Sequence, residues 1–167
     1  MEKVLTICRR YAAQFPKGGA TNLLFQGGPG LGKTYLSACI AREAADRGFS
    51  VCYDSAGAAL EHYERQRFGK EQEVQEAATA RIRQMEHCDL LILDDLGTEL
   101  HSPQNQSALY RMLNDRLTAK RPMIVSTNLD DEALLSRYGS QIHSRLLGEF
   151  ARVSFIGRDI RQIKKGN

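Results

Sequence analysis

The chain has 167 residues, of which 42% are hydrophobic and 26% are charged, and its formal net charge is +3. This length and balance fit one globular domain with an apolar core and exclude a disordered or membrane-embedded chain. The four scattered cysteines form no CxxC pair, and no stretch has the apolar length of a signal peptide or membrane span, so we expect a cytoplasmic protein without a zinc site or disulfide framework.

Two kinds of apolar pattern alternate along the chain. Short apolar or β-branched runs indicate strands, and apolar residues three or four positions apart indicate helices. In chain order, these patterns predict a helix over 4–15, a strand over 22–26, a helix over 33–47, a strand over 50–54, two helices within 56–86 broken near Gly69, a strand over 89–94, a helix over 104–119, a strand over 123–127, a largely helical stretch over 130–147 and a strand over 151–155. This alternation indicates a doubly wound α/β domain with helices on both faces of a parallel sheet.

The segment Gly27-Gly28-Pro29-Gly30-Leu31-Gly32-Lys33-Thr34 lies between the first predicted strand and the following helix. It matches the P-loop pattern, in which glycines allow backbone N–H groups and a helix N-terminus to point at phosphates. We expect these residues and the adjacent Tyr35 to bind the nucleotide, with Lys33 on the β- and γ-phosphates and the Thr34 hydroxyl on Mg²⁺. No Asn-Lys-x-Asp segment for reading guanine occurs, which favours ATP and ADP.

Polar residues follow the third and fourth predicted strands. Asp94 and Asp95 end the run LLILDD, where the first carboxylate is expected to hold the Mg²⁺ shell and the second to act as general base or to orient the attacking water. Asn128 ends the run IVSTN and is expected to polarise a water near the γ-phosphate, with an ordinary turn as the alternative. Arg145 is a candidate arginine finger for a neighbouring subunit, with a surface ion pair as the alternative.

The combination GGPGLGKT, LLILDDLGTE, IVSTN, IHSRLLG and FIGRDIR resembles the AAA+ domain of bacterial replicative-helicase loaders of the DnaC and DnaI type, and that of related transposition helper ATPases. The resemblance covers nearly all of residues 1–167 and implies a single AAA+ ATP-binding domain with sheet order 5-1-4-3-2 and no C-terminal helical lid. It further implies that Asn128 is the sensor asparagine, that Arg145 is the finger and that Arg161 lies near the nucleotide. The N-terminal helicase-binding domain of such loaders is absent from these residues.

By the same resemblance, the helices within 56–86 match an inserted segment associated with single-stranded DNA and self-assembly. This segment contains five basic residues and two aromatic ones: Arg65, Arg67, Lys70, Arg81, Arg83, Tyr63 and Phe68. Such interleaving suits a phosphate-tracking groove with stacking platforms, but the charge is offset by Glu61, Glu64, Glu71, Glu73 and Glu76, so a solvated helix pair remains an equal alternative. A second basic cluster, Arg158, Arg161, Lys164 and Lys165, is similarly ambiguous. We predict weak, salt-sensitive binding of single-stranded DNA.

The leading functional hypothesis is a slow, assembly- or DNA-stimulated ATPase that loads a replicative DNA helicase during initiation of replication. In this hypothesis, copies of the chain share ATP sites and contact the helicase and single-stranded DNA. The alternative within the same family is a transposition helper that acts with a transposase on duplex DNA. Two further hypotheses are a P-loop kinase and a nucleotide-dependent binding module without useful hydrolysis. The kinase is disfavoured because no lid or acceptor-binding segment is evident and because paired aspartates suit the activation of water.

Overall fold

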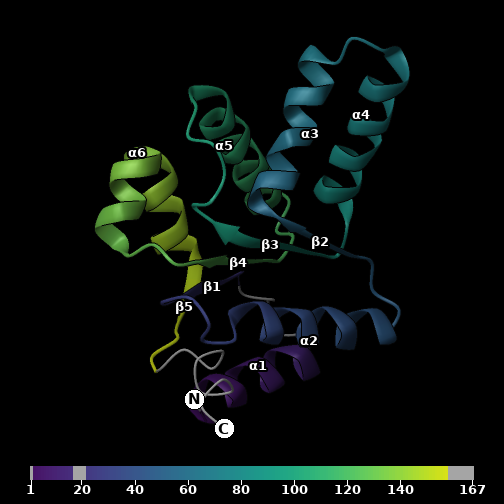
Figure 1. The fold of residues 1–167 in the computed structure, drawn as a ribbon. Helices are drawn as coiled ribbons and strands as arrows, with labels where there is room; N and C mark the ends of the chain where they lie inside the picture. The colour runs from purple at the N-terminus through teal and green to yellow at the C-terminus, as the bar shows by residue number, and fades with distance from the viewer. Residues whose placement is uncertain (1, 17–21, 158–167) are drawn as a thin grey trace, which may run out of the picture.

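The computed structural model describes residues 2–16 and 22–157 (Figure 1). In chain order, the elements are α1 (Glu2–Gln14), β1 (Asn22–Gln26), α2 (Lys33–Asp46), β2 (Val51–Ser55), α3 (Ala56–Phe68), α4 (Gln72–His87), β3 (Leu90–Leu96), α5 (Pro103–Thr118), β4 (Met123–Thr127), α6 (Asp131–Glu149) and β5 (Phe150–Ser154). Every predicted strand and helix is present. The expectation that no helical lid follows the last strand concerns residues 158–167, outside the described residues.

The strands form one five-stranded sheet in the order β2-β3-β4-β1-β5, and every neighbouring pair is parallel. This is the predicted order 5-1-4-3-2, read from the opposite edge, so the prediction is confirmed. Helices α3, α4, α5 and α6 lie on one face of the sheet, and α1 and α2 lie on the other (Figure 1). The carboxyl ends of β1, β3 and β4 therefore meet at one edge, where open parallel sheets bind ligands.

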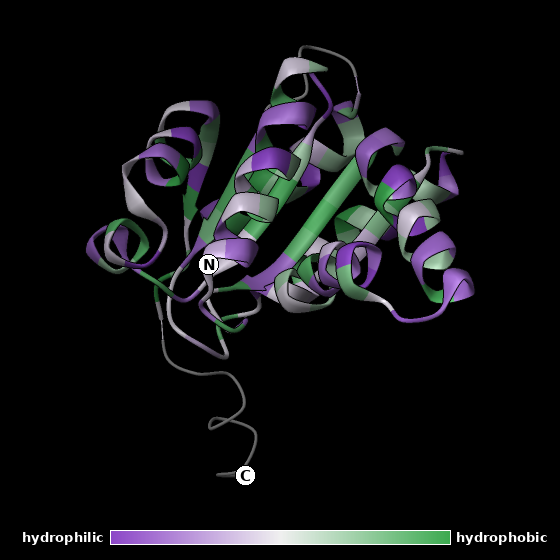
Figure 2. Ribbon diagram, turned by 90° about the horizontal axis from the view of Figure 1, so that it is seen from above, coloured by the Kyte–Doolittle hydropathy of each residue, from purple (hydrophilic) through white to green (hydrophobic). Residues whose placement is uncertain are grey.

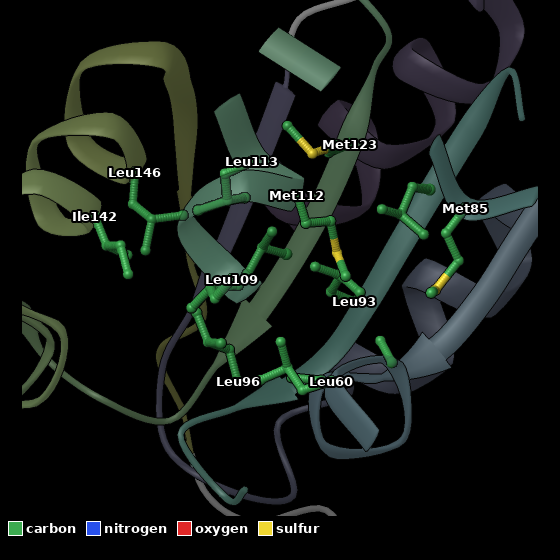
Figure 3. Packing of buried hydrophobic residues seen from close by; sticks show 14 of the residues in the cluster. Leu60, Met85, Leu93, Leu96, Leu109, Met112, Leu113, Met123, Ile142 and Leu146 are labelled. Carbon is green, nitrogen blue, oxygen red and sulfur yellow. The ribbon is translucent and has the colours of Figure 1, made fainter. Parts of the chain in front are cut away.

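The alternation of side chains along each strand divides the core into two clusters. On β3, Leu91 and Leu93 pack in the cluster beneath α3 to α6, whereas Leu90 and Ile92 pack in the cluster beneath α1 and α2. The strands form a hydrophobic central layer between helices of mixed polarity (Figure 2). Figure 3 shows the first cluster from close by, with Leu109 and Met112 of α5 pointing toward the side chains of β3. Both faces of the sheet are covered, which explains why β3 is a nearly continuous apolar run.

One large cation lies within this core. Arg116 of α5 is fully buried, and its guanidinium donates to the carbonyls of Met85, Cys88 and Pro122 at 2.6, 3.1 and 2.8 Å. In the described part of the chain, none of its hydrogen bonds goes to a carboxylate. The Met85 carbonyl belongs to the last turn of α4, where carbonyls lack helical partners and the helix dipole is negative. Arg116 thus connects the end of α4 to the start of β4.

Two local features differ from the sequence-based expectation. Strand β3 extends to Leu96 rather than ending at Asp94, because its pairing with β4 shifts register between Leu93 and Leu96 and then resumes at Thr127. Helix α6 is interrupted at Gly139, whose φ of 75° and ψ of 174° are not helical. The side chain of Gln106 donates to the Tyr138 carbonyl beside this interruption, supplying a hydrogen bond that the helix does not.

Candidate functional site

The glycine-rich loop curls back on itself between β1 and α2. Gly30 and Gly32 have φ values of 70° and 93°, in the left-handed region that favours glycine, and Gly32 is the N-cap of α2. Lys33 is buried, and its Nζ donates to the carbonyls of Gly27 and Gly28 at 2.6 and 2.7 Å. The loop and the ammonium therefore form one unit at the N-terminus of α2, which is a favourable position for phosphate.

A cavity of about 690 Å³ opens beside this loop. Its lining consists of Pro29, Gly30, Leu31, Gly32, Lys33, Thr34, Tyr35, Ala38, Asp95 and Asn128. Seven of the ten predicted nucleotide-binding residues therefore meet in one place, together with Asp95 of β3 and Asn128, which follows β4. Gly27 and Gly28 contribute through their carbonyls to Lys33 rather than to the lining. Most of the Tyr35 side chain is solvent-exposed, and Leu31 is buried in the core.

Asn128 and Lys33 are in direct contact across the sheet edge. The Lys33 Nζ donates to the Asn128 Oδ1 at 2.7 Å, although the two residues are 95 positions apart in the sequence. The structure therefore places the Asn128 side chain at the P-loop lysine. Its role as a sensor, rather than as a turn residue, stays a prediction.

Asp94 and Asp95 lie at the irregularity in β3. The register shift in the pairing with β4 aims the two carboxylates differently, a common use of a bulge beside a site. Asp94 is buried among hydroxyl groups, whereas Asp95 has a φ of 54° and lines the cavity. Aspartate tolerates this left-handed conformation better than most residues. Asp95 is thus the carboxylate that faces the cavity.

Two hydroxyl groups donate to Asp94 and a third contacts one of them, and sequence reasoning missed the role of all three residues. Ser126 of β4 donates to Oδ1 of Asp94, and Tyr53 of β2 donates to Oδ2 at 3.0 Å. The Tyr53 hydroxyl also lies 3.0 Å from the Oγ of Ser37 on α2. Burial is the main cause that raises the pKa of Tyr53 to about 12, so it remains a donor at neutral pH. The one available signal was the shared face: Tyr53 and Ser126 occupy strand positions whose side chains point toward α2.

The donor set fits Mg²⁺ bound together with a nucleotide. In residues 2–16 and 22–157, no group of three or more His, Cys, Asp or Glu side chains could hold a metal. Mg²⁺ in nucleotide sites is typically held by one or two protein oxygens and by phosphates rather than by a protein cage. The Thr34 hydroxyl and the Asp94 carboxylate are oxygens of that kind.

The loop after Asp95 is anchored by a buried glutamate in the motif DDLGTE. The side chain of Glu99 is 3% exposed; it accepts a hydrogen bond from the Gly97 N–H at 2.9 Å and another from the Tyr138 hydroxyl. Arg137 forms an ion pair with it at 3.4 Å. Glu99 thus connects the carboxyl end of β3 to helix α6, which explains why this motif contains a glutamate.

The two predicted arginines lie away from the cavity or outside the described residues. Arg145 is on α6, where its Nη2 donates to the Oδ1 of Asn114 on α5 at 2.8 Å, and it does not line the cavity of its own chain. Its role as an arginine finger stays a prediction. Arg161 lies outside the described residues, as does the cluster that contains it.

The fold and the site define a P-loop nucleotide-binding domain of the AAA+ class. The chain belongs to the family of IstB-like ATP binding proteins, whose pattern it matches over residues 14–157. The resemblance to DnaC- and DnaI-type loaders found in the sequence is confirmed, since curated relatives named DnaC match and solved structures of DnaC and DnaI share the fold.

Two curated relatives are replicative helicase loaders named DnaC. The protein from Buchnera aphidicola subsp. Acyrthosiphon pisum is 26% identical over 166 residues, covering 99% of this chain and 66% of the relative. The Escherichia coli K12 protein is 26% identical over 146 residues, covering 85% of this chain and 56% of the relative. The chain therefore spans less than two thirds of either relative.

Solved structures show the same fold. The DnaC helicase loader superposes with a TM-score of 0.79 at 20% identity, covering 93% of this chain and 89% of the other. DnaI gives a TM-score of 0.74 at 22% identity, covering 94% of this chain and 82% of the other.

Among the described residues, no helix is both long and apolar enough to cross a membrane.

Proposed function

We propose that this chain is the ATP-hydrolysing domain of a loader of a replicative DNA helicase and acts in initiation of DNA replication. The observation that carries the proposal is the cavity in which Lys33, Asp95 and Asn128, from three different elements, face one another beside the P-loop. The family supports nucleotide binding, and curated relatives named as helicase loaders support the role in replication.

Hydrolysis requires a water beside the γ-phosphate and a group that accepts its proton. Asp95 faces the cavity and is the candidate general base, and Asn128 lies where its amide can orient the same water. Lys33 stabilises charge on the phosphates as they separate. Mg²⁺ bound through Thr34 and Asp94 would neutralise phosphate charge. The finger assigned to Arg145 would come from a neighbouring copy, so the isolated chain is expected to hydrolyse ATP slowly.

The helix pair α3–α4 offers a surface for single-stranded DNA. Two of its five basic residues are engaged: Arg65 with Glu61 at 2.7 Å, and Arg81 with Asp54 at 2.6 Å. Arg67 lies over the ring of Phe68 at 5.1 Å, and 62% of the Phe68 surface is exposed. An exposed aromatic ring beside an arginine is the combination that stacks on bases while neutralising phosphate. The sequence left this point open, and these contacts favour Arg67 and Phe68 over Arg65 and Arg81.

Replacing Phe68 with alanine is expected to weaken binding of an oligothymidylate by about tenfold or more, because one base loses a stacking partner. Replacing Arg67 with alanine should reduce the magnitude of the salt slope by about 0.7, the value for one phosphate contact on a single strand. Fluorescence anisotropy between about 50 and about 200 mM salt measures both effects.

The matched control for this DNA experiment is Arg42→Ala, which removes a charge from the exposed surface of α2 on the opposite face of the sheet. Affinity that does not change with salt would contradict the proposed DNA surface. A clear preference for duplex over single strands would favour the transposition helper.

Capture of the full-length protein by the replicative helicase of its own host, with and without ATP, tests the loader assignment. We expect stable capture whose strength changes with ATP, because a nucleotide that binds two conformations unequally shifts their populations. In the Lys33→Ala variant, capture should no longer respond to ATP. Absence of capture in both nucleotide conditions would contradict the loader role while leaving the ATPase assignment to its own test.

A further inference from the structure

Tyr53 lies beside the candidate site, and the proposed hydrolysis reaction assigns no role to it. It is the third residue of β2, and its side chain packs in the cluster beneath α1 and α2. In the sheet register Tyr53 is opposite Ile92, so Asp94 is the next residue of β3 on the same face. The Tyr53 side chain extends diagonally from β2 toward Asp94 on β3, and its hydroxyl lies 3.0 Å from Asp94 Oδ2.

The protons available determine which group donates in each hydrogen bond around Asp94. An ionised carboxylate only accepts hydrogen bonds, and each hydroxyl has a single proton to donate. Ser126 donates to Oδ1 and Tyr53 donates to Oδ2, so both oxygens of the carboxylate are held, one by each flanking strand. When Tyr53 donates its proton to Asp94, its oxygen can accept the single Ser37 proton at 3.0 Å, for which the Thr34 carbonyl, also 3.0 Å from the Ser37 Oγ, competes.

The same hydroxyl links the carboxylate to the P-loop helix. The Tyr53 oxygen lies 3.4 Å from the Thr34 carbonyl, and the Ser37 hydroxyl lies 3.0 Å from that carbonyl. Ser37 is fully buried in α2, one turn after Thr34. Tyr53 is therefore placed between the two residues assigned to Mg²⁺, and it contacts the side chain of one and the backbone of the other.

We propose that Tyr53 is a positioning residue that orients the Asp94 carboxylate relative to Thr34, so that a nucleotide with Mg²⁺ binds more tightly than the nucleotide alone. This inference rests on the proposed function, which places Mg²⁺ and the nucleotide at this site. It assigns no contact between Tyr53 and the nucleotide. Its consequence is that the Tyr53 hydroxyl contributes to the gain in affinity that Mg²⁺ provides and to no other part of binding.

The test compares the dissociation constant of N-methylanthraniloyl-ADP in excess Mg²⁺ with that in EDTA. Tyr53→Phe keeps the ring in its packing and deletes only the hydroxyl. We expect this variant to lose about tenfold in affinity with Mg²⁺, the effect of a hydrogen bond to a charged group, and to match the wild type in EDTA. Tyr11→Phe is the matched control, because the Tyr11 hydroxyl is buried without a hydrogen-bond partner in the described part of the chain and Tyr11 packs in the same cluster as Tyr53.

Ser37→Ala provides a second variant in case Tyr53→Phe does not fold. It removes the contact with the Tyr53 oxygen. We expect a smaller loss of nucleotide affinity, again only in the measurement with excess Mg²⁺. An equal loss of affinity in both arms, or no loss in either, would overturn the role of Tyr53. A wild-type chain whose affinity for the nucleotide does not depend on Mg²⁺ would instead overturn the proposed Mg²⁺ site, and the inference with it.

Discussion

Replacing Lys33 with methionine is expected to weaken binding of ATP and ADP by about 100-fold or more. Removing one partner of a desolvated charged pair costs about 3 kcal/mol or more, and each 1.4 kcal/mol is about tenfold in affinity. Methionine keeps most of the apolar stem of a side chain that is 5% exposed, so the loss reports on the ammonium. Titration with a fluorescent ATP analogue measures the change.

Lys70→Met is the matched control for this substitution, because Lys70 lies on the segment between α3 and α4, away from the nucleotide cavity. Thermal unfolding of both variants checks that the fold is retained, since the Lys33 ammonium also bonds to the carbonyls of Gly27 and Gly28. A folded Lys33→Met variant with wild-type affinity would show that the nucleotide binds elsewhere.

Replacing Arg145 with alanine is expected to leave nucleotide affinity unchanged and to reduce assembly-stimulated hydrolysis by about 10³-fold, the lower end of the effect of an arginine finger. The physical reason for both expectations is the position of Arg145. Arg145 does not line the cavity of its own chain, so it can stabilise transition-state charge only at the site of a neighbour. Steady-state phosphate release under assembling conditions, measured against dilution, reports the effect.

Mixing subunits separates a role in trans from a role in cis. A Lys33→Ala subunit is expected to bind nucleotide too weakly for hydrolysis but retains Arg145, whereas an Arg145→Ala subunit is expected to bind nucleotide but lacks the candidate finger. Their mixture should regain part of the hydrolysis that each variant lacks. Arg42→Ala, an exposed arginine on α2, serves as the control for charge removal. Mixed assemblies that form and remain inactive would contradict the trans assignment.

Much of this architecture could be predicted because the relevant information is local. The strand runs, the helical spacing and the P-loop depend on residues that are neighbours in the chain, and the alternation of strand and helix indicates a parallel sheet. The placement of Asp95 and Asn128 at the nucleotide cavity followed from the same logic, since both end parallel strands on one sheet edge. The order of the strands came from the family resemblance, and the structure confirms it.

The residues that were missed depend on contacts between distant parts of the chain. Tyr53 reaches Asp94 across 41 positions, and no periodic pattern encodes which side chain of one strand lies diagonal to a carboxylate of another. The register shift in β3 was also invisible, because the predicted strand over 89–94 is a nearly continuous apolar run with no sign of an irregularity after it. Glu99 looked like a loop residue, and its burial against Tyr138 requires α6 to fold over that loop.

The sequence by itself determined the α/β fold class of this protein, its phosphate loop and the strand ends near which its acidic and amide groups lie, because these follow from local spacing and alternation. Only the tertiary structure decided how those groups are oriented. Hydroxyls from β2 and β4 bond to Asp94, a hydroxyl from α2 contacts that of β2, and Lys33 bonds to Asn128, because the register of the sheet brings these residues together. It also decided that Arg145 lies outside the cavity of its own chain, because α6 packs against α5 and holds it there.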